Sequence, residues 1–295
     1  MGRVDVSLVI VAYDMARELP RTIRSLLAPV QRLDPDLSME IIVVDNGSPE
    51  PVRPPDDGAW RLLRVPEPHR SPARAVNLGL AQAQGALVGV LVDGARMASP
   101  GMVRSAWMAS RLHHRPVIGT IGLHLGPDLQ QRTIRDGYDR AREDALLDSV
   151  CWWEDGYRLF AISSFAASSR HGWFGPLAES NALFLPRALW DELGGYDARF
   201  EQPGGGLVNL DTWARACLLP DPQVIVLLGE GTFHQVHGGV STNALVDPWP
   251  QFHEEYQAIR GRPFVAPPVE PLLLGSARRE TLALVEHAAR IARGG

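Results

Sequence analysis

Polar and aromatic side chains close three apolar runs in the first third of the chain. Tyr13 and Asp14 end the run VSLVIVAYD, Asp45 and Asn46 end IIVVDN, and Asp93 ends LVGVLVD. A carboxylate can accept a hydrogen bond from a ribose hydroxyl or an imino group, or coordinate a hard divalent cation, and an aromatic ring can stack on a base. These residue types indicate a site for a nucleotide, a metal ion or both.

The apolar runs that carry these residues resemble strands buried on both faces of a parallel sheet. Residues 6–13 and 40–46 are continuous and rich in β-branched side chains, and apolar residues at helical spacing lie between them over 18–33. We predict a further strand over 60–66, a helix over 73–83 and a strand over 86–93. Ligands bind outside the carboxyl ends of strands in such α/β sheets, so the polar residues stand where a site is expected.

The remaining sequence predicts more helices and strands, followed by a C-terminal segment that a linker separates from them. We expect helices over 101–113 and 128–150, an apolar segment over 117–125, and an irregular aromatic stretch over 151–180. A strand leads into a helix over 179–197, and a strand over 223–239 breaks into a loop with histidine and glycine. A proline-rich linker over 262–271 then precedes an amphipathic helix over 276–293.

Composition excludes several classes of protein. The chain has 295 residues, a net charge of −5 and no lysine, so it lacks a P-loop lysine, a Schiff-base lysine and an overall basic field for nucleic acid. Its two cysteines predict neither a disulfide framework nor a cysteine zinc site. Apolar runs fall short of the ~20 residues that a membrane span needs, which predicts a cytoplasmic protein.

Four blocks of sequence carry a family resemblance: SLVIVAYDMARELPRTIRSLL, IIVVDNGSPE, ARAVNLGLAQAQGALVGVLVDGA and LFLPRALWDELGGYDARF. Over residues 6 to about 240 the chain resembles family 2 of the glycosyltransferases, which are inverting enzymes of GT-A fold. The resemblance implies an α/β fold with a GT-A-like, Rossmann-type mixed sheet flanked by helices. It assigns residues 1–260 to this domain, with a nucleotide-binding half (1–100) and an acceptor and catalytic half (101–260), and leaves 261–295 as a linker and C-terminal helix.

The resemblance also implies the substrates and the residues that bind the donor. The donor would be a nucleoside diphosphate-sugar, and the acceptor a sugar or a lipid-linked molecule. Tyr13, Asp14 and Asp45 would hold the nucleoside, while Arg74 and Asn77 would reach toward the nucleotide-sugar. The alternatives are that residues 45–48 form only a turn after a strand, and that Arg74 and Asn77 lie on a helix surface.

The metal site that the resemblance implies is altered in this chain. Relatives carry an Asp-x-Asp motif whose second carboxylate binds a divalent ion, and here that position is Ala95, whose methyl group cannot coordinate Mn²⁺ or Mg²⁺. Either Arg96 neutralises the diphosphate in place of the ion, or Asp93 keeps the metal with help from a histidine. His234 or His237, beside Gly238 and Gly239, would supply that ligand.

The catalytic base implied by the resemblance is altered as well. Relatives place an acidic pair at the start of a helix beyond the GGYD block, and here the pair is replaced by Val208 and Asn209. We predict Asp211 as the base, with Glu201 and Glu179 as substitutes. The alternative for Asp211 is a helix cap. The two departures also keep open a non-catalytic nucleotide-sugar-binding subunit. A nucleotidyltransferase is disfavoured, because this chain has no glycine-rich, lysine-containing phosphate loop near its N-terminus.

Aromatic residues and the terminal helix suggest two further contacts. Trp152, Trp153, Trp173 and Phe174 would form a platform for the acceptor sugar or would close the core, with Trp173 in a mobile loop. The terminal helix would dock on the domain or make a peripheral contact with a membrane.

Overall fold

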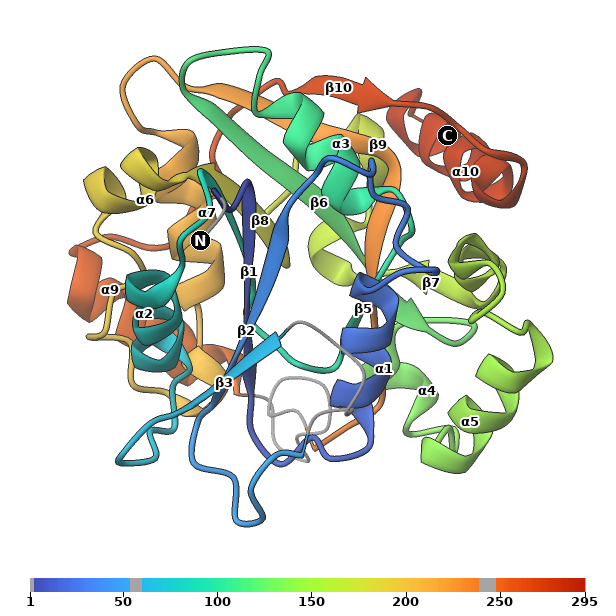
Figure 1. Ribbon diagram of the computed structural model, residues 1–295, viewed down its shortest axis with the longest axis horizontal. Helices are drawn as coiled ribbons and strands as arrows, with labels where there is room; N and C mark the ends of the chain where they lie inside the picture. Colours follow the sequence, from blue (N-terminus) through green and yellow to red (C-terminus); the bar gives the residue numbers. More distant parts are fainter. Residues whose placement is uncertain (1–2, 54–59, 239–247, 295) are drawn as a thin grey trace.

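The computed structural model describes residues 3–53, 60–238 and 248–294. Among these residues, strands form one mixed sheet in the order β10-β9-β6-β8-β4-β1-β2-β3, with β5 on β9 and β7 on β6. Figure 1 shows helices on both sides of this sheet. The strands are β1 (Val6–Ala12), β2 (Met39–Asp45), β3 (Trp60–Arg64), β4 (Leu87–Leu91), β5 (Arg96–Ala98), β6 (Pro116–Leu125), β7 (Ser163–Phe165), β8 (Ala182–Pro186), β9 (Gln223–His234) and β10 (Leu272–Gly275).

The first four strands in the chain, β1 to β4, are parallel, as their apolar runs predict. β1 pairs with β2 and with β4, and β2 pairs with β3. Successive side chains of a strand point to opposite faces, so each strand supplies two cores. On β1, Val9 and Val11 pack in one core with helix α2 (Ala73–Gln82), and Leu8 and Ile10 pack in the other with helix α1 (Glu18–Leu26). The predicted α/β fold with a GT-A-like mixed sheet is therefore observed.

The remaining helices cover the same two faces or extend from the sheet. α3 (Met102–Ala109) belongs to the core of α1, whereas α6 (Arg187–Leu193) and α7 (Val208–Cys217) belong to that of α2. The helix expected over 128–150 is two helices, α4 (Gln130–Thr133) and α5 (Arg140–Ser149), which project to one side in Figure 1. Short 3-10 turns fill residues 156–162, 167–169, 172–174 and 203–205.

The C-terminal segment adds a strand that the sequence pattern did not predict. β10 pairs in parallel with β9 at the edge of the sheet, with Leu272 opposite Ile225. Helix α9 (Trp249–Arg260) precedes it, and a short turn (Arg279–Thr281) and helix α10 (Leu282–Ala292) follow. Residues after the proline-rich linker therefore extend the main sheet as well as forming the expected helix.

Two antiparallel pairings determine which polar residues meet. β8 runs antiparallel to β4 with Ala182 opposite Leu91, so residues just before β8 lie beside those just after β4. β5 runs antiparallel to β9 with Arg96 opposite His234, and β6 lies on the other side of β9 with His124 opposite His234. Side chains directly opposite each other share a face of the sheet, so Arg96, His234 and His124 form a row.

Candidate donor and metal site

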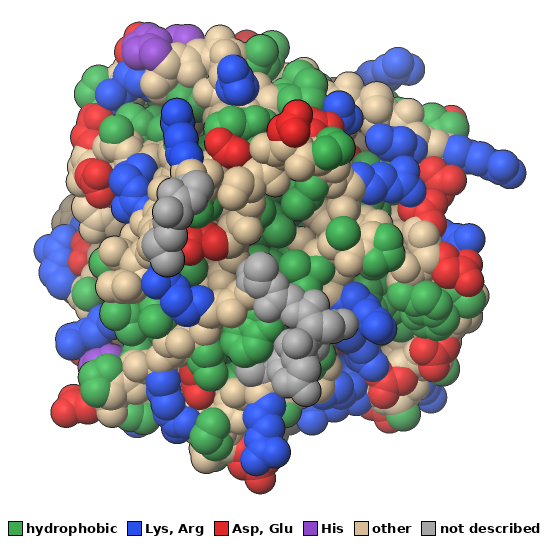
Figure 2. All heavy atoms as spheres, viewed as in Figure 1, with side chains coloured by type: hydrophobic (Ala, Val, Ile, Leu, Met, Phe, Trp, Pro, Cys, Tyr) green, Lys and Arg blue, Asp and Glu red, His purple; other side chains and the backbone are tan. Residues whose placement is uncertain are grey.

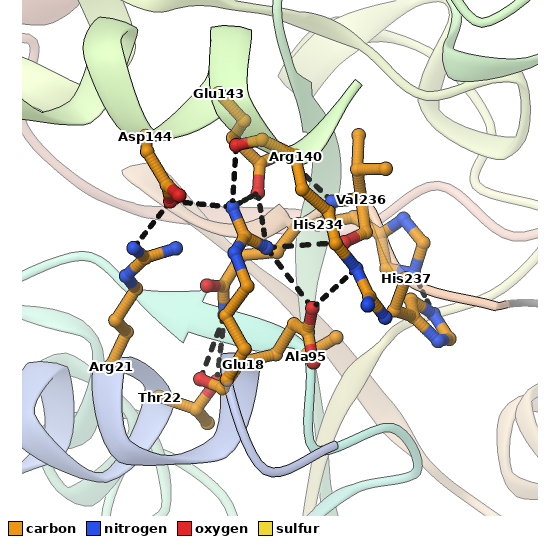
Figure 3. A network of polar contacts seen from close by, with 12 residues as sticks. Glu18, Arg21, Thr22, Ala95, Arg140, Glu143, Asp144, His234, Val236 and His237 are labelled. Carbon is orange, nitrogen blue, oxygen red and sulfur yellow. Dashed lines mark hydrogen bonds and ion pairs between the residues drawn. The ribbon is translucent and has the colours of Figure 1, made fainter. Parts of the chain in front are cut away.

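Asp93, His234 and His237 converge at the carboxyl edge of the sheet. The Nε2 atom of His234 lies 2.9 Å from Oδ2 of Asp93 and 3.0 Å from Nε2 of His237. The third side of this triangle, from His237 Nε2 to Asp93 Oδ2, is 3.3 Å. Figure 3 shows the two imidazole rings turned toward each other. The sequence left open which histidine would join Asp93, and the structure brings both.

The spacing of these three atoms fits a divalent cation. An ion with ligands at about 2.1 Å and right angles between them separates neighbouring ligand atoms by about 3.0 Å, which is close to the three observed distances. One carboxylate oxygen and two imidazole nitrogens on one face leave the opposite positions for ligand oxygens. Asp93, His234 and His237 can therefore hold an ion such as Mn²⁺ while a diphosphate completes its coordination.

Gln130 fixes the form of His234 that can bind a metal. Its side-chain oxygen lies 2.8 Å from Nδ1 of His234, and an oxygen can only accept, so Nδ1 of the neutral ring carries the proton and Nε2, which faces the centre of the cluster, is left to bind a metal. Gln130 is itself fully buried, and its backbone N–H donates to Nδ1 of His124. Sequence reasoning missed Gln130 because a glutamine in a short helix gives no metal-site pattern.

His237 lies on the loop after β9, and contacts with two helices hold that loop. The backbone N–H of Val236 donates to Oε2 of Glu143 on α5, and Arg17 at the start of α1 donates to the Val236 carbonyl. Arg17 also donates to Glu143 and Asp144, so one guanidinium links both helices to the loop. The neighbouring Gly239, expected to approach a phosphate, lies outside the described residues.

Burial and charge shift the protonation of the cluster. Burial and the nearby Arg96 guanidinium lower the pKa of His234 to about 4, so this imidazole is neutral at physiological pH. Burial alone would lower the pKa of His237, but the Asp93 carboxylate outweighs it and the pKa is raised. The carboxyl of Asp93 has a pKa well below its usual range because both histidines outweigh its burial. A carboxylate and a neutral imidazole are the forms that bind metal, so Asp93 and His234 are in those forms, whereas an ion would compete with the proton that the raised pKa favours on His237.

Arg96 adds positive charge beside the cluster. Its Nε lies 3.9 Å from Oδ2 of Asp93, and its side chain is 13% exposed. Among the described residues, its Nε and Nη1 are buried and make no hydrogen bond. Two unsatisfied N–H groups of a buried guanidinium can bind phosphate oxygens that enter the site.

Ala95 does not occupy a vacated ligand position. It is fully buried in the core that contains α1, its N–H donates to Oδ1 of Asp93, and its carbonyl accepts from Gln235. Its small side chain packs while its backbone orients Asp93. The candidate ligands at this place are therefore Asp93 and the two histidines.

The nucleoside candidates lie at the ends of β1 and β2. Tyr13 is half exposed, and Asp14 has a left-handed backbone whose N–H donates to Oγ of Ser48. Asp45 is fully buried, with Oδ1 accepting from the Ser48 N–H and Oδ2 3.6 Å from Arg64. That Oδ2 makes no hydrogen bond among the described residues, so it can accept one from a bound base or ribose.

Arg74 and Asn77 of α2 have different surroundings. Arg74 is half exposed and lines a hollow of about 240 Å³ whose other lining residues include His69, Arg70 and Glu201. Asn77 instead exchanges two hydrogen bonds with the backbone of Tyr196, donating to its carbonyl and accepting from its N–H. Asn77 thus fastens α2 to the GGYD turn, and its reach toward the nucleotide-sugar stays a prediction.

Asp211, the predicted base, lies in a buried ion-pair network. It is 1% exposed, and its oxygens accept from Nε and Nη2 of Arg260 and from Nε of Arg215. Arg260 also pairs with Asp197 of the GGYD block. Two guanidinium groups engage both oxygens of Asp211 through three hydrogen bonds, which favours a structural role, and its role as base stays a prediction.

The two substitute acids differ as well. The side chain of Glu201 is 74% exposed and lies 3.8 Å from Arg74, at the rim of the hollow on α2. Glu179 stands just before β8, near the end of β4, and its Oε2 accepts from the side chain of Asn209 at 2.6 Å. Within the described residues Glu179 has no basic partner, which separates it from Asp211 and Glu201.

The aromatic residues divide between core and surface. Trp152 and Trp173 are buried, and the indole N–H of Trp173 donates to the Glu230 carbonyl. The expectation of a mobile, sugar-facing Trp173 is therefore wrong, because this indole fills the core. Trp153 and Phe174 are partly exposed.

Figure 2 shows basic and acidic side chains interspersed over the face it presents. No helix among the described residues is long and apolar enough to cross a membrane.

Comparison with known proteins gives a family match and a shared fold. The model of the family described as "Glycosyl transferase family 2" matches residues 7–94, and no curated protein matches the chain. TarS 1-349 of S. aureus aligns with a TM-score of 0.54 and 12% identity, covering 87% of this chain and 64% of that one. The structure of TarS 1-349 in complex with UDP-GlcNAc aligns with a TM-score of 0.54 and 13% identity, covering 87% of this chain and 65% of that one. GalNAc-T7 with UDP, GalNAc and Mn²⁺ aligns with a TM-score of 0.53 and 13% identity, covering 86% of this chain and 48% of that one.

The family match and the structural likeness cover different lengths of the chain. The family match spans the strands and loops that carry Tyr13, Asp14, Asp45 and Asp93, whereas the solved structures show the fold over most of the chain. The chain spans less than two thirds of each of these solved structures. The predicted resemblance is confirmed: residues 7–94 match the model of glycosyltransferase family 2, and the chain shares the GT-A fold of the solved glycosyltransferases.

Proposed function

We propose that this protein transfers a sugar from a nucleoside diphosphate-sugar to an acceptor hydroxyl, with inversion at the anomeric carbon. The convergence of Asp93, His234 and His237 beside Arg96 carries the proposal, because it builds a diphosphate site where family 2 places one. The neighbours bound to UDP-GlcNAc and to UDP with Mn²⁺ support this class of donor. We further propose a sugar or lipid-linked acceptor and a cytoplasmic location.

The charges of the site suit a diphosphate that leaves with more negative charge than it had in the donor. A divalent ion held by Asp93, His234 and His237 would act as a Lewis acid on the diphosphate oxygens. The negative charge of Asp93 offsets one of the two positive charges of the ion, and Arg96 adds one positive charge. About two positive charges therefore face the two negative charges of a bound diphosphate diester. The fixed N–H groups of Arg96 stabilise the extra charge that develops on the leaving oxygen. In this scheme Arg96 and the ion act together.

The nucleoside would lie over the ends of β1 and β2. The half-exposed Tyr13 ring offers a face for the base, and the buried Asp45 offers an acceptor oxygen that makes no hydrogen bond within the described residues. Arg74, at the rim of the neighbouring hollow, can reach an anionic group from the other side. These residues lie within residues 7–94, the segment that matches the family model.

A second candidate function is a subunit that binds a nucleotide-sugar without turning it over. Asn209 favours it, since the acid that relatives use as base is missing at this helix. Binding alone would preserve the metal cluster and the nucleoside residues but would require no proton acceptor. The two functions predict the same donor binding and differ in nucleotide release.

Calorimetric titration with UDP, GDP and dTDP, each with Mn²⁺ and with EDTA, tests the proposed donor site. We expect one nucleotide to bind with Mn²⁺ and to lose at least tenfold in affinity with EDTA or in His237→Ala. His114→Ala is the matched control, because His114 belongs to a different His and Asp group with His113 and Asp221. Absence of binding by all three nucleotides under both conditions would refute the donor site.

A further inference from the structure

Glu179 occupies the edge of the sheet where the reaction would take place. It lies three residues before β8, whose first residue, Ala182, is paired with Leu91 at the end of β4. The chain before β8 therefore runs beside the chain after β4, which carries Asp93. The side chain of Glu179 is partly exposed, so a substrate hydroxyl can reach it from solvent.

Asn209 holds Glu179 through a neutral hydrogen bond. Its Nδ2 donates to Oε2 of Glu179 at 2.6 Å, and its Oδ1 accepts from the Tyr196 hydroxyl at 3.0 Å. Asn209 and Tyr196 are buried, so the amide is fixed from both sides. In contrast to the guanidinium partners of Asp211, the amide leaves Glu179 with one engaged oxygen, while Oε1 accepts no hydrogen bond from the described residues.

We propose that Glu179 is the catalytic base, and that it replaces the acid missing at position 209. This inference rests on the proposed function. Oε1 of Glu179 takes the proton of the acceptor hydroxyl as the acceptor oxygen forms its bond to the anomeric carbon. The bond from that carbon to the diphosphate oxygen breaks, and its electron pair leaves with the nucleoside diphosphate. Asn209 is a positioning residue: it orients the side chain of Glu179. Its amide stands where relatives carry an acid at the start of this helix.

The test measures nucleotide release from UDP-, GDP- and dTDP-sugars with water as the acceptor, because a base that deprotonates a sugar hydroxyl also deprotonates water. We expect Glu179→Gln to lower kcat by 10²- to 10⁴-fold with donor affinity unchanged, and to remove the acid limb of the pH profile. Gln retains an oxygen for the Asn209 hydrogen bond, so the variant should fold.

A second substitution separates catalysis from structure. Asn209→Asp in the Glu179→Gln background restores a carboxylate within 2.6 Å of the original one, and we expect it to recover at least tenfold of the lost rate. Sodium formate should likewise raise the rate of Glu179→Ala, since a small carboxylate can enter the vacated space.

The outcomes distinguish this inference from the proposed function. A wild-type protein that binds a donor and releases nucleotide at the same rate as Glu179→Gln would overturn the role of Glu179 alone. A wild-type protein that binds donor but releases no nucleotide would favour the non-catalytic subunit and overturn the base. A wild-type protein that binds no donor would overturn both.

Discussion

The ion-pair network of Asp211 gives a prediction that separates structure from catalysis. Asp211→Asn removes a buried carboxylate that pairs with Arg215 and Arg260, whose side chains are 26% and 17% exposed. Removing one partner of a buried pair costs about 3 to 5 kcal/mol. Arg260 retains Asp197 at 2.8 Å, so we expect the lower end, about 3 kcal/mol.

This loss should appear as a lower melting temperature. At about 2.1 cal/mol/K per residue, the unfolding entropy of 295 residues is about 0.6 kcal/mol/K, so the variant should melt about 5 °C below the wild type. Circular dichroism during heating and in urea measures this change. Asp34→Asn is the control, because its pair with Arg104 is half exposed and should contribute less than about 1 kcal/mol.

The rate of nucleotide release by folded Asp211→Asn completes the experiment. We expect it to stay within about threefold of the wild type at a temperature where both proteins are folded. A loss of two orders of magnitude together with an unchanged melting temperature would refute the structural assignment and make Asp211 the base.

Three further substitutions test other parts of the site. Gln130→Leu removes the acceptor for His234 Nδ1 and should weaken Mn²⁺ binding 10- to 100-fold in calorimetry; unchanged affinity would contradict the role of Gln130. Burial raises the pKa of Glu143 to about 7, so its proton favours the folded state, and stability should fall by roughly 3 kcal/mol as pH rises from 4.5 to 7. Urea unfolding of Glu143→Gln should show a smaller fall over this window, and an equal fall would refute the assignment. Gly79→Ala would place a Cβ 2.3 Å from Cγ1 of Val9 and should cost about 1 to 3 kcal/mol in the same assay, whereas a stable variant would show that α2 can shift.

The sequence predicted the part of the site that depends on local pattern. Parallel strands bring their carboxyl ends to one edge, so apolar periodicity alone was enough to group Tyr13, Asp14, Asp45 and Asp93. The histidines after the last long strand were added from the family resemblance, and β9 does end at the same edge. Both histidines, rather than one, reach Asp93, since His234 closes the strand and His237 returns on the loop.

The parts that the sequence did not predict depend on contacts between distant residues. Asp211 pairs with Arg260, which lies 49 positions along the chain, and nothing in the helix around Asp211 indicates that partner. Asn209 and Glu179 are 30 positions apart and meet because β8 enters the sheet antiparallel to β4. β10 is a short leucine run at a sheet edge, where packing rather than period selects the strand.

The loop that carries His237 couples metal occupancy to the stability of the helices around it. Asp93 lies between β4 and β5 and His234 ends β9, whereas His237 follows Val236, which Glu143 of α5 and Arg17 beside α1 hold by its backbone. An ion bound to all three ligands would act as a cross-link between the sheet and these helices. By mass action, amides of α5 should exchange with solvent more slowly as the free ion concentration rises above its dissociation constant.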